Sequence, residues 1–181
     1  MPIAYRDGKN REARHQMALA ALEEGICINN SSVTLVHRLS RPIGALFHVA
    51  HGISNAMVLK ACFSFALEGT YERFADLTRA IGVADAQMGD IAAAEQFLKA
   101  IEHICEVCEV PTLEKYGIPR EEFYAAIPKM AQDALDSGSP GNTRKAPTFE
   151  DCQEIYKAAY ARQKFKSNAR ETWCVILVSA S

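Results

Sequence analysis

The sequence predicts an all-α fold arranged as a helical bundle. Apolar residues recur at helical spacing in most segments, whereas only the stretch ETWCVILVS at residues 171–179 looks extended, and a single strand has nothing to pair with. No G-x-G-x-x-G motif follows a strand, and there is no Walker-type loop. We therefore expect one helical domain over residues 1–160, no recognisable nucleotide-binding α/β domain, and an atypical C-terminal tail over residues 161–181.

The first half of the chain contains three segments with clear helical character. Residues 11–22 are rich in strong helix formers, so we expect a helix that ends near Gly25. Residues 51–66 are almost continuously apolar, which predicts a central helix buried on several sides. Residues 70–82 repeat apolar side chains at helical spacing, and Thr70 is the expected N-cap.

The second half predicts three more helices separated by loops rich in Pro and Gly. Residues 91–110 carry one long apolar stripe and should form the longest helix. Residues 120–135 show the same periodicity, with a kink expected at Pro128. Thr148 is expected to cap the last helix, with Asp151 in a capping-box position. The total expected is six or seven helices.

The composition excludes several classes of partner. There are 20 basic and 22 acidic residues and a net charge of -2. The chain therefore has no excess of positive charge that would attract nucleic acid or an anionic membrane. The longest apolar stretch near the C-terminus, WCVILV, is too short to span a bilayer. The six cysteines lie singly or three apart in apolar runs, without a secretory signal before them, which predicts a reducing cytoplasm.

Three of the five histidines cluster between residues 37 and 51. Neutral imidazole is a common ligand for zinc and ferrous iron, so His37, His48 and His51 are the best candidates for chemistry. On one straight helix His37 and His51 would be roughly 21 Å apart, so they could share an ion only if the chain turned between them. Pro42 and Gly44 would supply that turn by breaking the helix. The alternative is that these are ordinary hydrogen-bonded histidines.

The remaining histidines and a hydrolase-type zinc site are less strongly indicated. The run His103-x-Cys105-x-x-Cys108 suggests zinc, but a closed zinc site needs a second ligand pair, and these cysteines fall on an apolar stripe, so buried packing is favoured. His15 lies among charged residues and is expected to be solvated. A zinc hydrolase using the three clustered histidines lacks any H-E-x-x-H or similar carboxylate spacing.

The histidine segment resembles the signature of the iron-containing (group III) alcohol dehydrogenases, H-x3-H-x9-H-G-x2-N-A with an Asn seven residues upstream. The matching residues are Asn30, His37, Arg41 in place of the second His, His51, Gly52, Asn55 and Ala56. The turn Gly141-Asn142-Thr143-Arg144 is similar to the family's G-N-P-R turn, with Thr143 replacing Pro. The resemblance covers roughly residues 8–160.

The resemblance implies the C-terminal helical domain of such an enzyme, with a dehydroquinate synthase-like fold. In the family, an Asp and three His hold a catalytic Fe2+, sometimes Zn2+, and hydride passes between an alcohol and NAD(P). His37 and His51 correspond to the last two metal ligands. The first two come from a D-x3-H segment that has no match here, because Arg11 stands four residues before His15. Binding of metal or NAD(P) by this chain alone is therefore expected to be weak.

Arg41 replaces a histidine that the family places in the active-site cleft near the substrate. A guanidinium stays charged at neutral pH, so Arg41 could orient a polar substrate but could not shuttle protons. Arg41 is therefore the candidate catalytic residue, and the sequence indicates no particular residue for binding the dinucleotide.

Two functions follow from these expectations. The first is the metal-binding part of an NAD(P)-dependent alcohol dehydrogenase acting on a small alcohol or aldehyde, truncated and inactive alone. The second is a non-catalytic helical interaction module that forms a homodimer or pairs with a separate nucleotide-binding domain.

Overall fold

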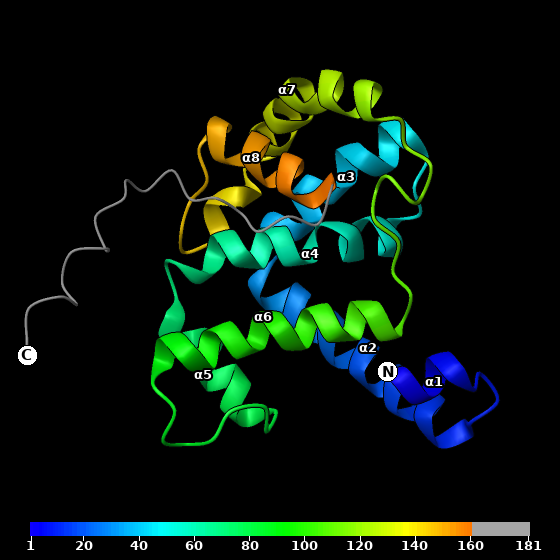
Figure 1. Cartoon of the computed structure of the whole chain (residues 1–181), viewed down its shortest axis with the longest axis vertical. Coiled ribbons are helices and arrows are strands. Elements are labelled where there is room, and N and C mark those ends of the chain that lie inside the picture. The colour runs from blue at the N-terminus through cyan, green and yellow to red at the C-terminus, as the bar shows by residue number, and fades with distance from the viewer. Residues whose placement is uncertain (161–181) are drawn as a thin grey trace, which may run out of the picture.

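The computed structural model describes residues 1–160, and within them every regular element is a helix, as predicted (Figure 1). The elements are α1 Pro2–Arg6, α2 Arg11–Ser31, α3 Leu35–Phe47, α4 His51–Leu67, α5 Tyr71–Ala80, α6 Asp90–Val107, α7 Arg120–Asp136, the 3-10 helix η1 Ser139–Asn142 and α8 Phe149–Tyr160. The eight α-helices of this part exceed the predicted six or seven because the short α1 precedes α2. The segment predicted to be extended, 171–179, lies outside the described residues.

Helices α3, α4, α7 and α8 enclose the main core. Leu39, Val58, Phe65, Phe123 and Tyr156 are wholly buried there. The hydroxyl of Tyr156 donates a hydrogen bond to the carbonyl of Leu39 at 2.8 Å, which joins α8 to α3. Large apolar side chains in full burial provide most of the stabilisation of a domain of this size. The two helices that carry His37 and His51 therefore belong to the best-packed part of the molecule.

The start of α8 confirms the predicted capping box. The backbone N–H of Asp151 donates to Thr148 Oγ1 at 3.1 Å, and the N–H of Thr148 donates to Asp151 Oδ2 at 3.0 Å. The cap predicted at Thr70 is different: Thr70 precedes α5, but its hydroxyl donates to the carbonyl of Ala66 in the preceding helix. Thr70 therefore holds the turn between α4 and α5 and does not cap α5 with its side chain.

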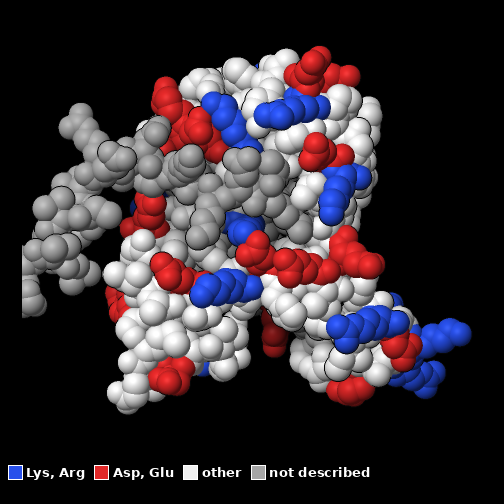
Figure 2. All heavy atoms as spheres, viewed as in Figure 1, with Lys and Arg blue, Asp and Glu red and all other residues white. Residues whose placement is uncertain are grey.

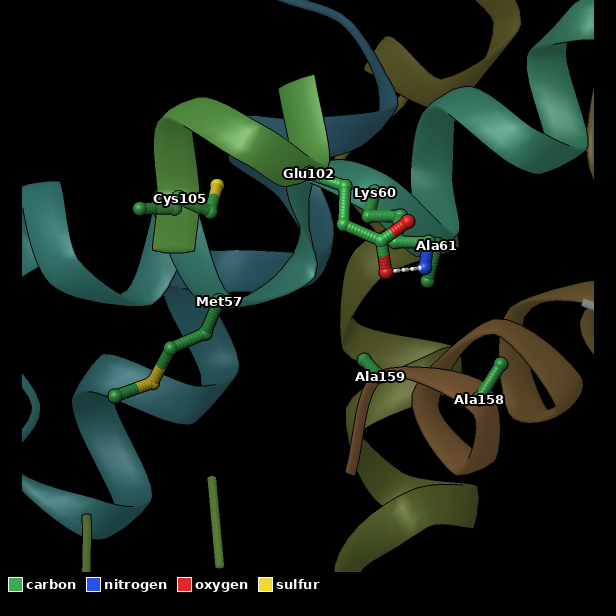
Figure 3. Close-up of a pocket in the computed structure, with 8 residues that line it drawn as sticks. Met57, Lys60, Ala61, Glu102, Cys105, Ala158 and Ala159 are labelled. Carbon is green, nitrogen blue, oxygen red and sulfur yellow. Dashed lines mark hydrogen bonds and ion pairs between the residues drawn. The ribbon is translucent and has the colours of Figure 1, made fainter. Parts of the chain in front are cut away.

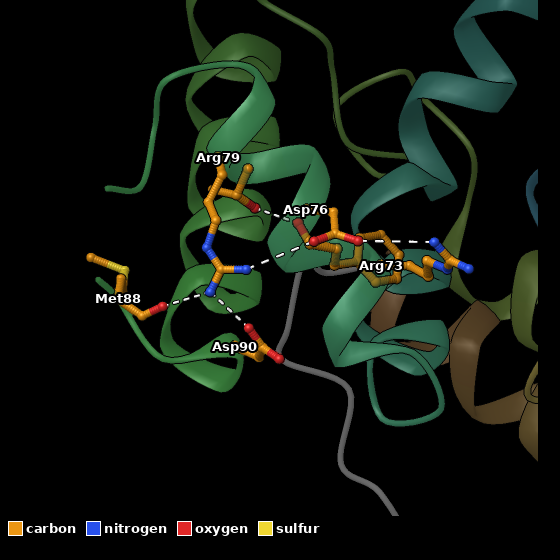
Figure 4. A network of polar contacts seen from close by, with 7 residues as sticks. Arg73, Asp76, Arg79, Met88 and Asp90 are labelled. Carbon is orange, nitrogen blue, oxygen red and sulfur yellow. Dashed lines mark hydrogen bonds and ion pairs between the residues drawn. The ribbon is translucent and has the colours of Figure 1, made fainter. Parts of the chain in front are cut away.

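Helices α5 and α6 form a pair that lies against α4 (Figure 1). Arg79 of α5 donates to the carbonyl of Met88 at 2.6 Å and to Asp90 Oδ1 at 2.7 Å, so one guanidinium fastens α5 to the start of α6 (Figure 4). An ion pair between Lys60 and Glu102 joins α4 to α6 beside a small cavity (Figure 3). The Lys60–Glu102 pair thus connects α4, whose first residue is His51, to α6.

Helix α2 differs from its prediction in two respects. It does not end near Gly25 but continues to Ser31, and with 21 residues it is longer than the 18-residue α6, which was expected to be the longest helix. A glycine inside a helix costs about 1 kcal/mol relative to alanine, which lowers stability without ending the helix. The chain instead reverses at Ser32, which has a φ of 64°. No residue of α2 is buried.

The predicted helix break at Pro42–Gly44 is also wrong. Helix α3 runs through both residues, because Pro42 removes only one backbone hydrogen bond while the fully buried Ile43 holds this stretch in the core. The chain turns later, at His48, which adopts the left-handed conformation with φ 53° and ψ 34°. Gly44 permits this turn, since a Cβ at that position would lie 3.1 Å from the carbonyl oxygen of Val49.

Acidic and basic side chains are interspersed over the described part of the face seen in Figure 2. This distribution agrees with the net charge of -2 and shows no extended basic field on that face. Within residues 1–160 no helix combines the length and the apolar character needed to cross a membrane.

Candidate metal centre

The turn between α3 and α4 brings His37 and His51 together. Their ring centroids are 5.4 Å apart and their planes are inclined at 47°. An ion held tetrahedrally by two imidazole nitrogens at about 2.1 Å would place the ring centroids about 5 Å apart, so the observed separation fits two ligands of one ion. The residues present thus fit half of a metal site, and the chain makes the turn between them that a shared ion would require.

A short hydrogen-bond chain orients His51. The hydroxyl of Ser40, a buried residue of α3, is hydrogen-bonded to Asn55 Oδ1, and that contact directs Asn55 Nδ2 toward His51 Nε2 at 3.2 Å. This contact between the amide and the ring restrains the orientation of the His51 imidazole. An ion bound at Nε2 would have to displace the amide of Asn55 from that nitrogen.

The surroundings of His37 favour its neutral form. Partial burial lowers the pKa of His37, and the neighbouring His51, Arg41 and Arg38 lower it further, while the charge of Glu24 acts in the opposite direction. Only a neutral imidazole has a lone pair for a metal. His37 is consequently ready for coordination near neutral pH.

The other predicted residues are exposed on the surfaces of α2, α3 and α6. Arg41 is exposed one helical turn after His37 on α3, close enough for its charge to act on His37. His48 caps α3 and is exposed, and His15 and His103 are exposed on α2 and α6. Within residues 1–160 no group of three or more His, Cys, Asp or Glu side chains is placed to hold an ion. The zinc interpretation of His103, Cys105 and Cys108 is therefore not supported there.

Sequence reasoning did not single out Glu24, which lines a cavity at the start of α4. Glu24 of α2 lines an open cavity of about 500 Å³ together with Gly52 and Asn55 from the first turns of α4. The remaining wall comes mainly from apolar residues of α6, including Ile101 and Ile104. The sequence does mark Glu24, because it stands between apolar residues at helical spacing. It lies thirteen residues before His37, however, so the sequence does not connect the two.

Comparison with known proteins identifies relatives of this chain. Long-chain-alcohol dehydrogenase 1 of Geobacillus thermodenitrificans is 29% identical over 160 residues, which cover 87% of this chain and 40% of the relative. Lactaldehyde reductase of Escherichia coli is 29% identical over 152 residues, covering 83% of this chain and 39% of that enzyme. The chain thus spans about two fifths of the length of the curated relatives it matches.

Solved structures show the same fold. A 1,3-propanediol oxidoreductase superposes with a TM-score of 0.82 at 27% identity, covering 88% of this chain and 41% of that chain. An alcohol dehydrogenase from Oenococcus oeni gives a TM-score of 0.80 at 28% identity, with the same coverage. The profile of the Fe-containing alcohol dehydrogenase family, C-terminal, matches residues 1–160. The chain therefore belongs to the Fe-containing alcohol dehydrogenase family, of which it carries the C-terminal, all-helical part.

Proposed function

We propose that residues 1–160 form the metal-side part of an NAD(P)-dependent alcohol dehydrogenase, with His37 and His51 as metal ligands. The observation that carries this proposal is the approach of the two rings to 5.4 Å between centroids, in a chain that belongs to this family. The reaction is hydride transfer between a small alcohol and the corresponding aldehyde or ketone. The tail, residues 161–181, is outside this functional part.

The chain's own side chains have distinct tasks in this proposal. When bound, Fe2+ or Zn2+ supplies Lewis-acid polarisation of the substrate oxygen. His37 binds because its lowered pKa keeps it neutral, and Asn55 restrains the orientation of the His51 ring. Arg41 orients a polar substrate with its exposed guanidinium and cannot move protons, since it remains charged.

Two histidines alone make a weak site, because catalytic sites usually offer at least three protein ligands. We therefore propose that these 181 residues are inactive by themselves and depend on further ligands and a dinucleotide-binding domain that lie outside them. The purified chain should give no turnover with NAD(H) or NADP(H), Fe2+ or Zn2+ and short alcohols or aldehydes. Measurable turnover in this assay would contradict the proposed inactivity.

A hybrid enzyme tests the ligand assignment. Residues 1–160 replace the matching C-terminal part of the Escherichia coli lactaldehyde reductase, which aligns over 152 residues. We expect metal content and dehydrogenase activity in the hybrid, both lost in His37→Ala or His51→Ala and both retained in His103→Ala, whose imidazole is exposed on α6. A hybrid in which the three substitutions have equal effects on metal content would refute the assignment.

A second function is supported by the surface of the two N-terminal helices. Ile3, Leu22 and Ile26 are 63%, 62% and 55% exposed, and α2 buries none of its residues. Exposed apolar patches commonly mark association surfaces. The alternative is therefore a non-catalytic interaction subunit that forms a homodimer or binds a separate nucleotide-binding partner. Sedimentation analysis with and without candidate partners tests it, and a monomer under every condition would argue against it.

The thiols favour a reducing compartment such as the cytoplasm. All five cysteines within residues 1–160 are free, and three of them, Cys62, Cys105 and Cys152, are buried. Free thiols are typical of proteins in reducing compartments.

A further inference from the structure

We propose that a second cavity of this chain binds a small organic carboxylate that carries a short apolar chain. The cavity has a volume of about 250 Å³ and lies between the first turn of α3, the second half of α4, helix α5 and the turn that follows η1. Neither the histidine pair nor Arg41 lines it. The site is therefore separate from the metal centre and does not depend on the proposed function.

The charged side chains at this cavity are basic. Arg73 of α5 and Arg144 both line it, and none of its described lining residues is acidic. The Arg144 side chain makes no hydrogen bond or ion pair with the other described residues. Arg73 approaches Asp76 only at 3.9 Å, and both side chains of that pair are more than half exposed, so water screens their attraction (Figure 4). Both guanidinium groups are therefore available, and paired N–H donors suit a carboxylate.

Two helices also begin at this cavity. Thr34 is the N-cap of α3 and Thr70 is the N-cap of α5, and both residues line the cavity. Neither caps its helix through its side chain, and Thr70 Oγ1 donates instead to the carbonyl of Ala66 at 2.9 Å. The first N–H groups of an α-helix have no partner within the helix, and the helix dipole makes this end positive. An anion would thus be stabilised by both helix ends as well as by the arginines.

Thr143 adds an unsatisfied hydroxyl to the same wall. Its Oγ1 is buried and has no hydrogen-bond partner among the described residues. The adjacent Asn142 donates to the carbonyl of Val33 at 3.2 Å, which holds this turn against the start of α3. A buried hydroxyl without a partner is destabilising, and a carboxylate oxygen would provide the acceptor. The family turn has Pro at this position, so the hydroxyl is a feature of this chain rather than of the family pattern.

The rest of the lining is largely apolar, which determines the other half of the ligand. Phe63 of α4 and Phe74 and Leu77 of α5 line the cavity, and the two phenylalanine ring centroids are 5.7 Å apart. These side chains favour contact with hydrocarbon and offer nothing to a hydrated inorganic ion. Ligand cavities commonly have volumes of about 300–1,000 Å³, so this smaller one suits a short chain or a single ring and excludes a dinucleotide.

Isothermal titration calorimetry of the full 181-residue chain with hexanoate tests the site. Hexanol carries a similar tail without the charge, whereas acetate and inorganic phosphate carry charge without the tail. Arg73→Gln and Arg144→Gln remove the cations, and Thr143→Val removes the hydroxyl while keeping the shape of the side chain. Arg14→Gln is the matched control, because it removes the same charge from an exposed position on α2. Circular dichroism of each variant checks that the helices are retained.

We expect saturable binding of hexanoate that weakens at least about tenfold in Arg144→Gln and is unchanged in Arg14→Gln. Arg73→Gln and Thr143→Val should also bind more weakly, and Thr143→Val should raise the melting temperature of the ligand-free chain, since it removes an unsatisfied hydroxyl. Hexanol, acetate and phosphate should each bind at least about tenfold more weakly than hexanoate. His37→Ala should retain hexanoate binding, because the site is separate from the metal centre.

Absence of saturable hexanoate binding to the unmodified chain would overturn the proposal. Equal hexanoate affinity in the three arginine variants would also overturn it, because binding would then not depend on this cavity. Phosphate binding as tight as that of hexanoate would exclude the apolar half of the site, and hexanol binding as tight would exclude its anionic half.

Discussion

Replacing Tyr156 with phenylalanine tests how firmly α3 is held in the core. The Tyr156 hydroxyl is buried and donates to the carbonyl of Leu39 at 2.8 Å, in the helix that carries His37 and Arg41. Phenylalanine keeps the ring and its edge-on contact with Phe123, whose centroid is 6.1 Å away. Only the hydrogen bond is lost, so the free energy of unfolding should fall by about 1 kcal/mol at neutral pH.

For a chain of this size, that loss lowers the melting temperature by about 2–4 °C. Thermal unfolding followed by circular dichroism measures the change, with Tyr116→Phe as the control because Tyr116 is 42% exposed. The control should melt within about 1 °C of the unmodified chain, since surface substitutions rarely exceed 0.5 kcal/mol in either direction. Equal melting temperatures for Tyr156→Phe and the unmodified chain would refute the importance of this hydrogen bond.

The loss of unfolding free energy in Tyr156→Phe should also depend on pH, and the burial of Tyr156 determines the sign. Burial raises the pKa of Tyr156, with a smaller contribution from Cys62 and Cys152, whereas in the unfolded chain a tyrosine ionises near pH 10. Above that pH the unfolded state releases a proton that the folded state keeps, so the native chain loses about 1.4 kcal/mol of stability per pH unit from this group. The difference in free energy of unfolding between the unmodified chain and Tyr156→Phe should therefore shrink above pH 10 and change sign near pH 11. Urea unfolding at pH 8, 10 and 11 measures it, and a constant deficit would contradict this explanation.

Three further predictions concern other parts of the fold. Thr148→Ala removes half of the capping box of α8 and should cost about 1 kcal/mol in urea unfolding, whereas no change would show that the cap is unimportant. Gly69→Ala should cost about 1–3 kcal/mol, because the new Cβ would lie 2.8 Å from the Cβ of Lys145; an unchanged urea midpoint would exclude this close approach. A thiol reagent should label the exposed Cys27 rapidly and the buried Cys62 only after unfolding, as peptide mass spectrometry can determine; equal rates would show that the core is open.

The helices could be predicted from the sequence where one strong pattern covered a whole element. The uninterrupted apolar run from residue 51 became α4, and Thr148 with Asp151 became the capping box of α8. The errors came from local signals that tertiary contacts override. Gly25 and Pro42 each weaken a helix by a limited amount, and burial of Ile43 compensates at Pro42. No sequence pattern near Gly25 or Pro42 indicates that the helix continues past that residue.

The spacing of His37 and His51 left open whether the two rings could meet, because that depended on a turn whose position could not be predicted. The turn that joins the rings lies at His48, where a non-glycine residue adopts a left-handed conformation. It depends on the contact between Gly44 and the carbonyl of Val49, which is visible only in three dimensions.

The two histidines of the candidate site are held by different contacts. His37 lies on α3, which Tyr156 and the main core hold in place, and His51 begins α4, which the Lys60–Glu102 ion pair connects to α6. The fold of residues 1–160 therefore sets their separation. An ion shared by this pair would not have to bring the two helices together, so its binding should change the stability of the core less than in a domain that folds only around its metal.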